Sequence, residues 1–370
     1  MKIGVITTSR ADFGIYLPLL EKIKSKKLFE LKLYAGGSHV EKSLGYTVDE
    51  IIEKGFRPII LPPVFGQSFS PLGISNNMGN SLKTFAQAFS ENPADFVICL
   101  GDRYEMMAYV LALIPFNIPL AHIHGGEETE GAIDNKFRHA LTQLCDYHFV
   151  SCEKYKERVI QMKGFPQKVF NIGSLSLDKL DSFRKVDYND FQKRVGFSSK
   201  INFGLVTFHP TTLESFTKNK KDVEEFIEAL ILSQKNYLIT LPNADTYGDY
   251  YRKAFINLNK KNPSKYFIVE SLGADYYFNA LTFADFMIGN SSSGIIEAAS
   301  FNLPVINIGI RQKGRESSQN TLHVKEDKNS ILKAIKKVQD FGGQIFFNIY
   351  KNKNRKASDE LFTFLEQKAQ

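Results

Sequence analysis

The chain has 370 residues, a length that fits two α/β domains better than one. Lys and Arg number 47 against 40 Asp and Glu, and the net charge of +7 suits a phosphate-bearing ligand, although surface solubility alone also explains it. No long basic run alternates with aromatic residues, so we expect no nucleic-acid partner.

The three cysteines, Cys99, Cys145 and Cys152, form neither a metal-ligand pattern nor an even disulfide set, which indicates a reducing cytoplasm. The first residues, MKIGVITTSR, lead directly into a strand and lack the features of a secretory signal. No apolar stretch reaches the roughly 18 residues that a membrane helix needs, so we expect no membrane association.

Short apolar strands alternate with amphipathic helices along the chain. One series of strands is expected at residues 2–8, 30–35, 96–100, 119–123, 147–151 and 168–172, and a second at residues 203–208, 237–241, 266–269, 286–288 and 304–308. Helical patterns lie between them, for example at residues 16–24, 82–89, 136–144 and 222–232. Such repeated strand–helix units predict parallel sheets with right-handed crossovers.

The two series predict an α/β fold of two Rossmann-like domains, residues 1–175 and residues 201–350. The polar stretch 176–200 is interpreted as a connecting segment, and residues 351–370 as a helix that can cross back to the first domain. Ligands of doubly wound sheets bind beyond the carboxyl ends of the strands, so we expect an interdomain cleft lined by the loops that follow the strands.

The clearest predicted anion site is the motif GNSSSGIIEAAS at residues 289–300, which follows a strand and opens a helix. Backbone N–H groups at a helix start bind phosphate oxygens, and a Ser-rich cap is the competing structural interpretation. Glu297, about one turn later, can accept hydrogen bonds from both ribose hydroxyls. The motif's hydroxyl donors and its close-approach position are Ser291, Ser292, Ser293 and Gly294.

Basic residues follow strands in both predicted domains. Arg311 and Arg315 can clamp a diphosphate, and His209, in TFHPTT, can donate to a phosphate and help it leave. Arg10 and Arg103 follow strands of the first domain. Each alone is explained by a surface ion pair, but their shared position at strand ends favours binding.

The first domain carries a cluster suited to proton transfer: Asp102 in GDR, then HIHGGEETEGAIDNKFRHA at residues 122–140, with His124, Glu127 and Asp134. His122 and His124 alternate on a strand and are expected to point to opposite faces, which argues against a metal site. We expect neither a metal nor another cofactor.

The chain resembles the bacterial hydrolysing UDP-N-acetylglucosamine (UDP-GlcNAc) 2-epimerases that supply N-acetylmannosamine (ManNAc) for sialic acid synthesis. The resemblance covers nearly the whole chain to about Val324 and rests on TSRADFG, LGDRYE, HIHGGE, AIDNKFRHA, NIGS, FHPTT, PNAD, GNSSSGIIEA, INIGIRQKGR and NTLHV. It implies the GT-B-like fold of one glycosyltransferase superfamily, a homodimer, and a UDP-sugar substrate. The implied reaction is anti-elimination of UDP through a 2-acetamidoglucal, followed by addition of water to give ManNAc and UDP.

By motif, Asp102 and Asp134 match acid/base positions of the family, and His209 matches its phosphate-side histidine. Many relatives carry HIEGGE, and their catalytic glutamate falls at His124; either Glu127 takes over the carboxylate's role or His124 serves itself. The positions that match nucleotide contacts are Arg10, Arg103, Asn243, Ser291, Ser292, Glu297 and Arg311.

Three alternatives stand beside a hydrolysing UDP-GlcNAc 2-epimerase. The same reaction on UDP-N,N'-diacetylbacillosamine, for legionaminic acid, stays open because the sequence does not locate the pocket around C4 and C6 of the sugar. A GT-B glycosyltransferase needs an acceptor site. A non-enzymatic nucleotide-sugar sensor has no use for Asp102, Glu127 and Asp134 together.

Overall fold

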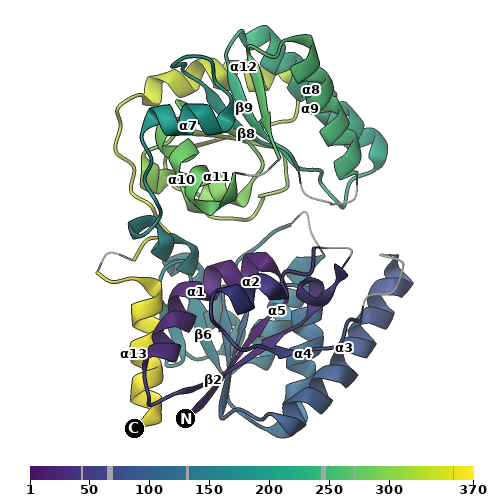
Figure 1. Ribbon diagram of the computed structural model, residues 1–370, viewed down its shortest axis with the longest axis vertical. Coiled ribbons are helices and arrows are strands. Elements are labelled where there is room, and N and C mark those ends of the chain that lie inside the picture. Colours follow the sequence, from purple (N-terminus) through teal and green to yellow (C-terminus); the bar gives the residue numbers. More distant parts are fainter. Residues whose placement is uncertain (43–44, 65–69, 131–132, 243–246, 271, 353) are drawn as a thin grey trace. The chain divides into compact units, whose positions relative to one another are not determined.

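The computed structural model describes residues 1–370 except 43–44, 65–69, 131–132, 243–246, 271 and 353. It contains two compact units (Figure 1). Unit 1 comprises Met1–Glu127, Ile133–Asp178 and Tyr350–Gln370, and unit 2 comprises Glu128–Ala132 and Lys179–Ile349. Each unit holds one parallel sheet, which confirms the predicted two-domain α/β fold.

Within the described residues, unit 1 forms a seven-stranded sheet of order β3-β2-β1-β4-β5-β6-β7. The order reverses between β1 and β4, so the loops after these two strands diverge at the edge where such sheets bind ligands. The strands are β1(Lys2–Thr7), β2(Glu30–Ala35), β3(Ile59–Ile60), β4(Phe96–Leu100), β5(Leu120–Ile123), β6(Tyr147–Val150) and β7(Val169–Asn171).

Helices cover both faces of this sheet (Figure 1). One apolar core joins the sheet to α1(Arg10–Ser25), α2(Val48–Glu53) and α13(Ala357–Ala369). The opposite core joins it to α3(Pro71–Glu91), α4(Tyr104–Leu113) and α5(Asp134–Leu144), while α6(Glu153–Lys163) follows β6. The final helix α13 is fixed to unit 1 because Asp178 accepts hydrogen bonds from Ala357 N and Ser358 N at 2.9 and 2.7 Å.

Unit 2 repeats this architecture with a six-stranded sheet, counted over the described residues, of order β10-β9-β8-β11-β12-β13. Its order reverses between β8 and β11. The strands are β8(Gly204–Thr207), β9(Tyr237–Thr240), β10(Tyr266–Val269), β11(Phe286–Gly289), β12(Val305–Ile308) and β13(Thr321–Val324). The helices are α7(Tyr188–Val195), α8(Phe216–Ser233), α9(Gly248–Lys261), α10(Gly273–Phe283), α11(Ser292–Ile296) and α12(Lys328–Lys337).

The structure differs from the predicted elements at three places. The strands β3 and β13 were not predicted, since β3 has only two residues and β13 is only partly buried. Residues 179–200, predicted as part of a connecting segment, belong to unit 2, because α7 buries Phe191 and Val195 in that unit's core. The helix after β11 has five residues and passes into the 3-10 turn Ala298–Phe301.

Candidate functional site

In unit 1, Asp102 and His124 follow two neighbouring strands, β4 and β5. Gly101 N donates to Ile123 O at 3.1 Å, so the ladder between these strands continues up to the residues just before Asp102 and His124. Asp102 forms an ion pair with the guanidinium of Arg138 on α5, whose side chain is 3% exposed. Asp102 is therefore held as a carboxylate beside a buried positive charge.

His122 fixes the turn that carries Asp102. Its Nε2 lies 2.8 Å from Gly101 O, and its Nδ1 lies 3.2 Å from the hydroxyl of Thr142 on α5. Because a carbonyl oxygen only accepts, Nε2 carries a proton. Burial lowers the pKa of His122 to about 4, so the ring is neutral at neutral pH. As expected for alternating strand residues, His122 faces this interior network rather than pairing with His124.

His124 and Glu127 form a second connected pair. His124 Nδ1 lies 3.1 Å from Glu127 Oε1, and the hydroxyl of Ser151 donates to the same oxygen at 2.8 Å. Both members of the pair are buried. The intervening Gly126 has φ +76°, and a Cβ there would lie 2.8 Å from Tyr155 O, so the tight turn requires glycine.

The other predicted residues of unit 1 have different surroundings. Asp134 is the first residue of α5, one turn before Arg138 and on the same helix face. Arg10 starts α1; its side chain is 68% exposed and lies 3.0 Å from Glu50. Arg103 lies 2.7 Å from the fully buried carboxylate of Glu105. The structure thus links Asp102 and His124 through neighbouring turns, whereas both arginines are engaged by carboxylates of unit 1.

In unit 2, the predicted anion motif lies where β11 ends. Gly289 has φ +144°, and a Cβ there would overlap Thr207 O of β8, so only glycine fits. The hydroxyl of Ser291 caps α11 by accepting from Ser293 N at 3.3 Å. Because α11 is one short turn, its dipole is weak, and the motif offers hydroxyl and backbone N–H donors instead of a full helix start.

Asn290 connects this motif to His209. Its side-chain Oδ1 accepts from His209 N at 2.8 Å, and its Nδ2 donates to His209 O at 2.8 Å. Its own carbonyl accepts from Arg311 Nη1 and Gln312 Nε2, both at 3.0 Å. The ends of β8, β11 and β12 are therefore joined through one buried asparagine.

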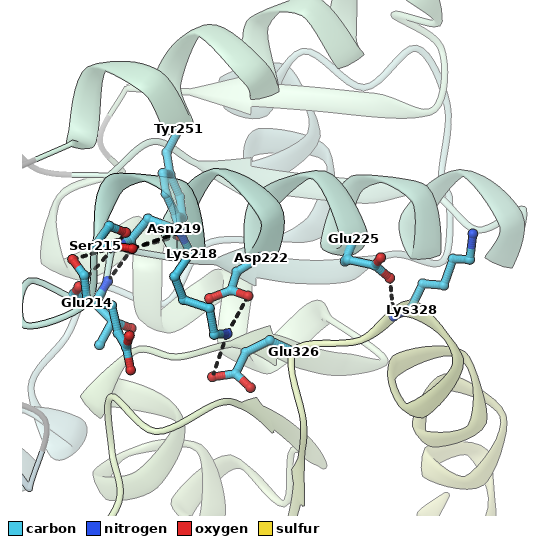
Figure 2. A network of polar contacts seen from close by, with 10 residues as sticks. Glu214, Ser215, Lys218, Asn219, Asp222, Glu225, Tyr251, Glu326 and Lys328 are labelled. Atoms are coloured by element: carbon cyan, nitrogen blue, oxygen red, sulfur yellow. Dashed lines mark hydrogen bonds and ion pairs between the residues drawn. The ribbon is translucent and has the colours of Figure 1, made fainter.

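Asn219 on α8 fixes the chain just after His209. Figure 2 shows Asn219 among Glu214, Ser215 and Tyr251. Its Oδ1 accepts from Thr211 N at 2.8 Å and its Nδ2 donates to Thr211 O at 3.0 Å, with further bonds to Glu214 O and Ser215 O. Tyr251 of α9 donates to the same Oδ1 at 3.1 Å. Asn219 thus holds the loop after β8 in a single conformation.

The imidazole of His209 is not used in holding that loop. Its Nδ1 is buried and has no hydrogen-bond partner among the described residues. Burial, with a smaller contribution from the charge of Arg311, lowers the pKa of His209 to about 3. The ring is neutral at neutral pH, and a phosphate beside it can accept a hydrogen bond from one ring nitrogen.

Glu297 lies at the end of α11, and burial raises the pKa of its carboxyl although the nearby Ser293 hydroxyl lowers it. Tyr277 of α10 is close by: burial and then the charge of Glu297 raise its pKa to about 12. A partly buried carboxyl with hydroxyl neighbours suits the recognition of sugar hydroxyls. Two other predicted contacts remain. The backbone N–H of Arg315 donates to Gln312 O in the loop after β12. Asn243 lies outside the described residues.

Four contributing residues were not predicted. Arg138 and Ser151 support the carboxylates of unit 1, and Asn219 and Asn290 support His209. Sequence signals existed for two of them, since Arg138 follows Asp134 by one helical turn and Asn290 lies inside GNSSSG. Ser151 and Asn219 come close only through the tertiary fold.

No group of three or more His, Cys, Asp or Glu side chains in the described part of the chain could hold a metal ion. Over the same residues, every helix is too short or too polar to cross a membrane.

The family model for UDP-N-acetylglucosamine 2-epimerase matches residues 21–358. The chain belongs to this family. It is 33% identical over 339 residues to the GDP/UDP-N,N'-diacetylbacillosamine 2-epimerase (hydrolyzing) of Campylobacter jejuni, covering 91% of this chain and 87% of the relative. It is 34% identical over 341 residues to the polysialic acid biosynthesis protein P7 of Escherichia coli, covering 92% and 86%.

Solved structures share the fold of this UDP-GlcNAc 2-epimerase family member. One is the UDP-GlcNAc 2-epimerase of Methanocaldococcus jannaschii in complex with UDP-GlcNAc and UDP. It matches with a TM-score of 0.79 at 17% identity, over 99% of this chain and 100% of that chain. The expected GT-B-like epimerase fold is confirmed.

Proposed function

We propose that this protein is a hydrolysing UDP-GlcNAc 2-epimerase. It eliminates UDP through a 2-acetamidoglucal and adds water to give ManNAc for sialic acid synthesis. The observation that carries the proposal is the pair of adjacent turns after β4 and β5, which place Asp102, His124 and Glu127 at the sheet edge where ligands bind. The word "hydrolyzing" in one relative's name supports the hydrolysing reaction, and "polysialic acid" in another's supports the sialic acid role.

The chemistry requires two kinds of group. The C2 proton is weakly acidic, so the C1–O bond to UDP must loosen while a base removes that proton. Unit 1 supplies groups for proton transfer, including Asp102 and Asp134. Unit 2 supplies hydroxyls, backbone N–H groups, Arg311 and the neutral His209, which stabilise the departing diphosphate. Glu297 receives the ribose hydroxyls, and Arg10, Arg103, Asn243 and Arg315 remain proposed substrate contacts.

The second candidate is the same reaction on UDP-N,N'-diacetylbacillosamine. The Campylobacter jejuni relative, named for that substrate, favours it at 33% identity. The two sugars differ at C4 and C6, away from the bonds that break, so the groups proposed for proton transfer serve both equally well.

The test is incubation with each UDP-sugar in heavy water, followed by NMR of the products. Hydrolysing epimerisation gives free UDP and a 2-epimeric sugar with deuterium at C2, and the better substrate identifies the sugar. An adduct formed only with an added acceptor would show a glycosyltransferase. Binding without turnover would show a sensor, and either result would overturn the proposal.

The family resemblance also supports a homodimer, which light scattering on the purified protein tests directly. A cytoplasmic location is supported by the three cysteines, all free in the structure.

A further inference from the structure

His124 adopts an unusual backbone conformation at the end of β5. Its φ is +65°, in the left-handed region that few residues other than glycine occupy. The conformation is held from outside the turn, because His124 N donates to Phe149 O at 2.9 Å. Strained residues that the surroundings hold in place cluster at functional sites, and this one carries an imidazole.

The contact with Glu127 assigns the proton on this ring. Nδ1 lies 3.1 Å from Glu127 Oε1, and a carboxylate oxygen only accepts, so Nδ1 carries the hydrogen. In a neutral imidazole the other nitrogen then has a lone pair. Nε2 is buried and has no hydrogen-bond partner among the described residues. The fold therefore presents a basic nitrogen that it does not itself use.

Glu127 is held by more than the histidine. The hydroxyl of Ser151 donates to the same Oε1 at 2.8 Å, and the side chain of Glu127 is 3% exposed. With two donors on one oxygen, this carboxylate is fixed in orientation and faces the edge of the imidazole. Its position suits it to align the ring and to stabilise a positive charge on it.

We propose that His124 Nε2 is the base that removes the C2 proton, with Glu127 and Ser151 as positioning residues; this inference rests on the proposed function. As Nε2 takes the proton, the C2–H electron pair becomes the second bond between C1 and C2. The C1–O electron pair leaves with UDP. His124 becomes an imidazolium beside the Glu127 carboxylate and later releases its proton to solvent. One water molecule then supplies the hydroxyl at C1 and, overall, one hydrogen at C2.

The first test is the variant His124→Asn, because asparagine tolerates the left-handed backbone region but cannot act as a base. We expect UDP release to slow by roughly 10²–10⁴-fold, the usual contribution of a general base, while the Kd for UDP stays within about twofold. The matched control is His323→Gln on β13, which removes an exposed histidine and leaves turnover unchanged. Near-native turnover of His124→Asn overturns the proposal.

The second test reads the positioning role without relying on a variant of His124. In the wild-type protein, ¹⁵N NMR of the histidine rings should show His124 protonated at Nδ1. Glu127→Gln should shift the proton toward Nε2 and lower kcat by up to roughly 10⁴-fold with little change in KM, as occurs when an amide replaces an orienting carboxylate. Wild-type His124 protonated at Nε2, or full kcat in Glu127→Gln, contradicts the assignment.

Measurements on the wild-type protein and on His124→Asn separate the proposed function from the assignment of the base. If the wild-type protein releases no UDP from either sugar nucleotide, the proposed function is wrong. If the wild-type protein turns over and His124→Asn does too, only the assignment of the base is wrong.

Discussion

The side-chain amide of Asn290 pairs with both backbone polar groups of His209, accepting from its N–H and donating to its carbonyl, each at 2.8 Å. Asn219 forms the same pair of bonds with Thr211 two residues later. Pro210 between them has no N–H to satisfy. Beyond the end of β8, the side chains of Asn290 and Asn219 thus form the backbone hydrogen bonds that a neighbouring strand would otherwise provide. They position His209 without using its ring.

We expect Asn290→Ala to weaken UDP binding about tenfold or more, because the backbone of His209 loses both side-chain hydrogen bonds that position it. The lost hydrogen bonds should also lower the free energy of unfolding by about 1–3 kcal/mol. Isothermal titration calorimetry with UDP and denaturant unfolding measure the two effects. Tyr251→Phe is the matched control, since it removes only the hydroxyl bond to Asn219. A folded Asn290→Ala variant with native UDP affinity would refute the positioning role.

Glu297→Ala tests the predicted ribose contact. One charged hydrogen bond contributes roughly 1.5–3 kcal/mol, so the Kd for UDP should rise by about tenfold to a hundredfold. The control Glu228→Ala breaks an exposed pair with Lys328, and the Kd should not change. If both variants bind UDP like the wild type, Glu297 does not contact the nucleotide.

Asp102→Asn and Asp134→Asn should each lower turnover by roughly 10²–10⁴-fold while UDP binding stays nearly intact, because the amide keeps the shape and loses the proton function. Asp102→Asn also breaks the ion pair with the buried Arg138, which should lower the free energy of unfolding. Adding Arg138→Met removes that buried charge and should recover stability but not turnover. Recovery of turnover in the double variant would show that Asp102 acts only through the fold.

Much of the fold was predictable from its apolar runs. β4 is apolar and buried along its whole length, and β4, β2 and β10 all begin and end as predicted. The length of α11 could not be predicted, since the repeated serines and Gly294 cap a helix well but do not extend it. Motifs after strands indicated Asp102, His124 and His209 from position alone. Their partners were not predictable in this way. Ser151 lies 24 residues from its partner Glu127, and Asn219 lies 8 residues from its partner Thr211, and only tertiary packing brings them together.

Four buried histidines make the protein sensitive to acid. Desolvation is the main cause in each case, and it lowers the pKa of His39 and His122 to about 4 and of His148 and His209 to about 3. Below the ordinary value of about 6.5, the unfolded chain binds protons that the folded chain does not. The contribution of these four histidines to the free energy of unfolding is therefore fully present above about pH 6.5. It decreases as the pH falls toward their folded-state pKa values.

His148 isolates this effect, because neither ring nitrogen has a hydrogen-bond partner among the described residues and the side chain is fully buried on β6. His148→Leu keeps a similar volume and removes the unpaired polar atoms, so we expect a gain of about 1–3 kcal/mol in unfolding free energy at pH 7.5. Below about pH 6.5 the gap over the wild type should widen by up to about 1.4 kcal/mol per pH unit, since only the wild type loses stability through this group. Comparing the two proteins cancels the contributions of groups that do not interact with His148. Urea unfolding from pH 8.5 to pH 5 measures the gap, which should be constant above about pH 7.5; a gap that does not change with pH would show that His148 is protonated in the folded protein as readily as in the unfolded chain.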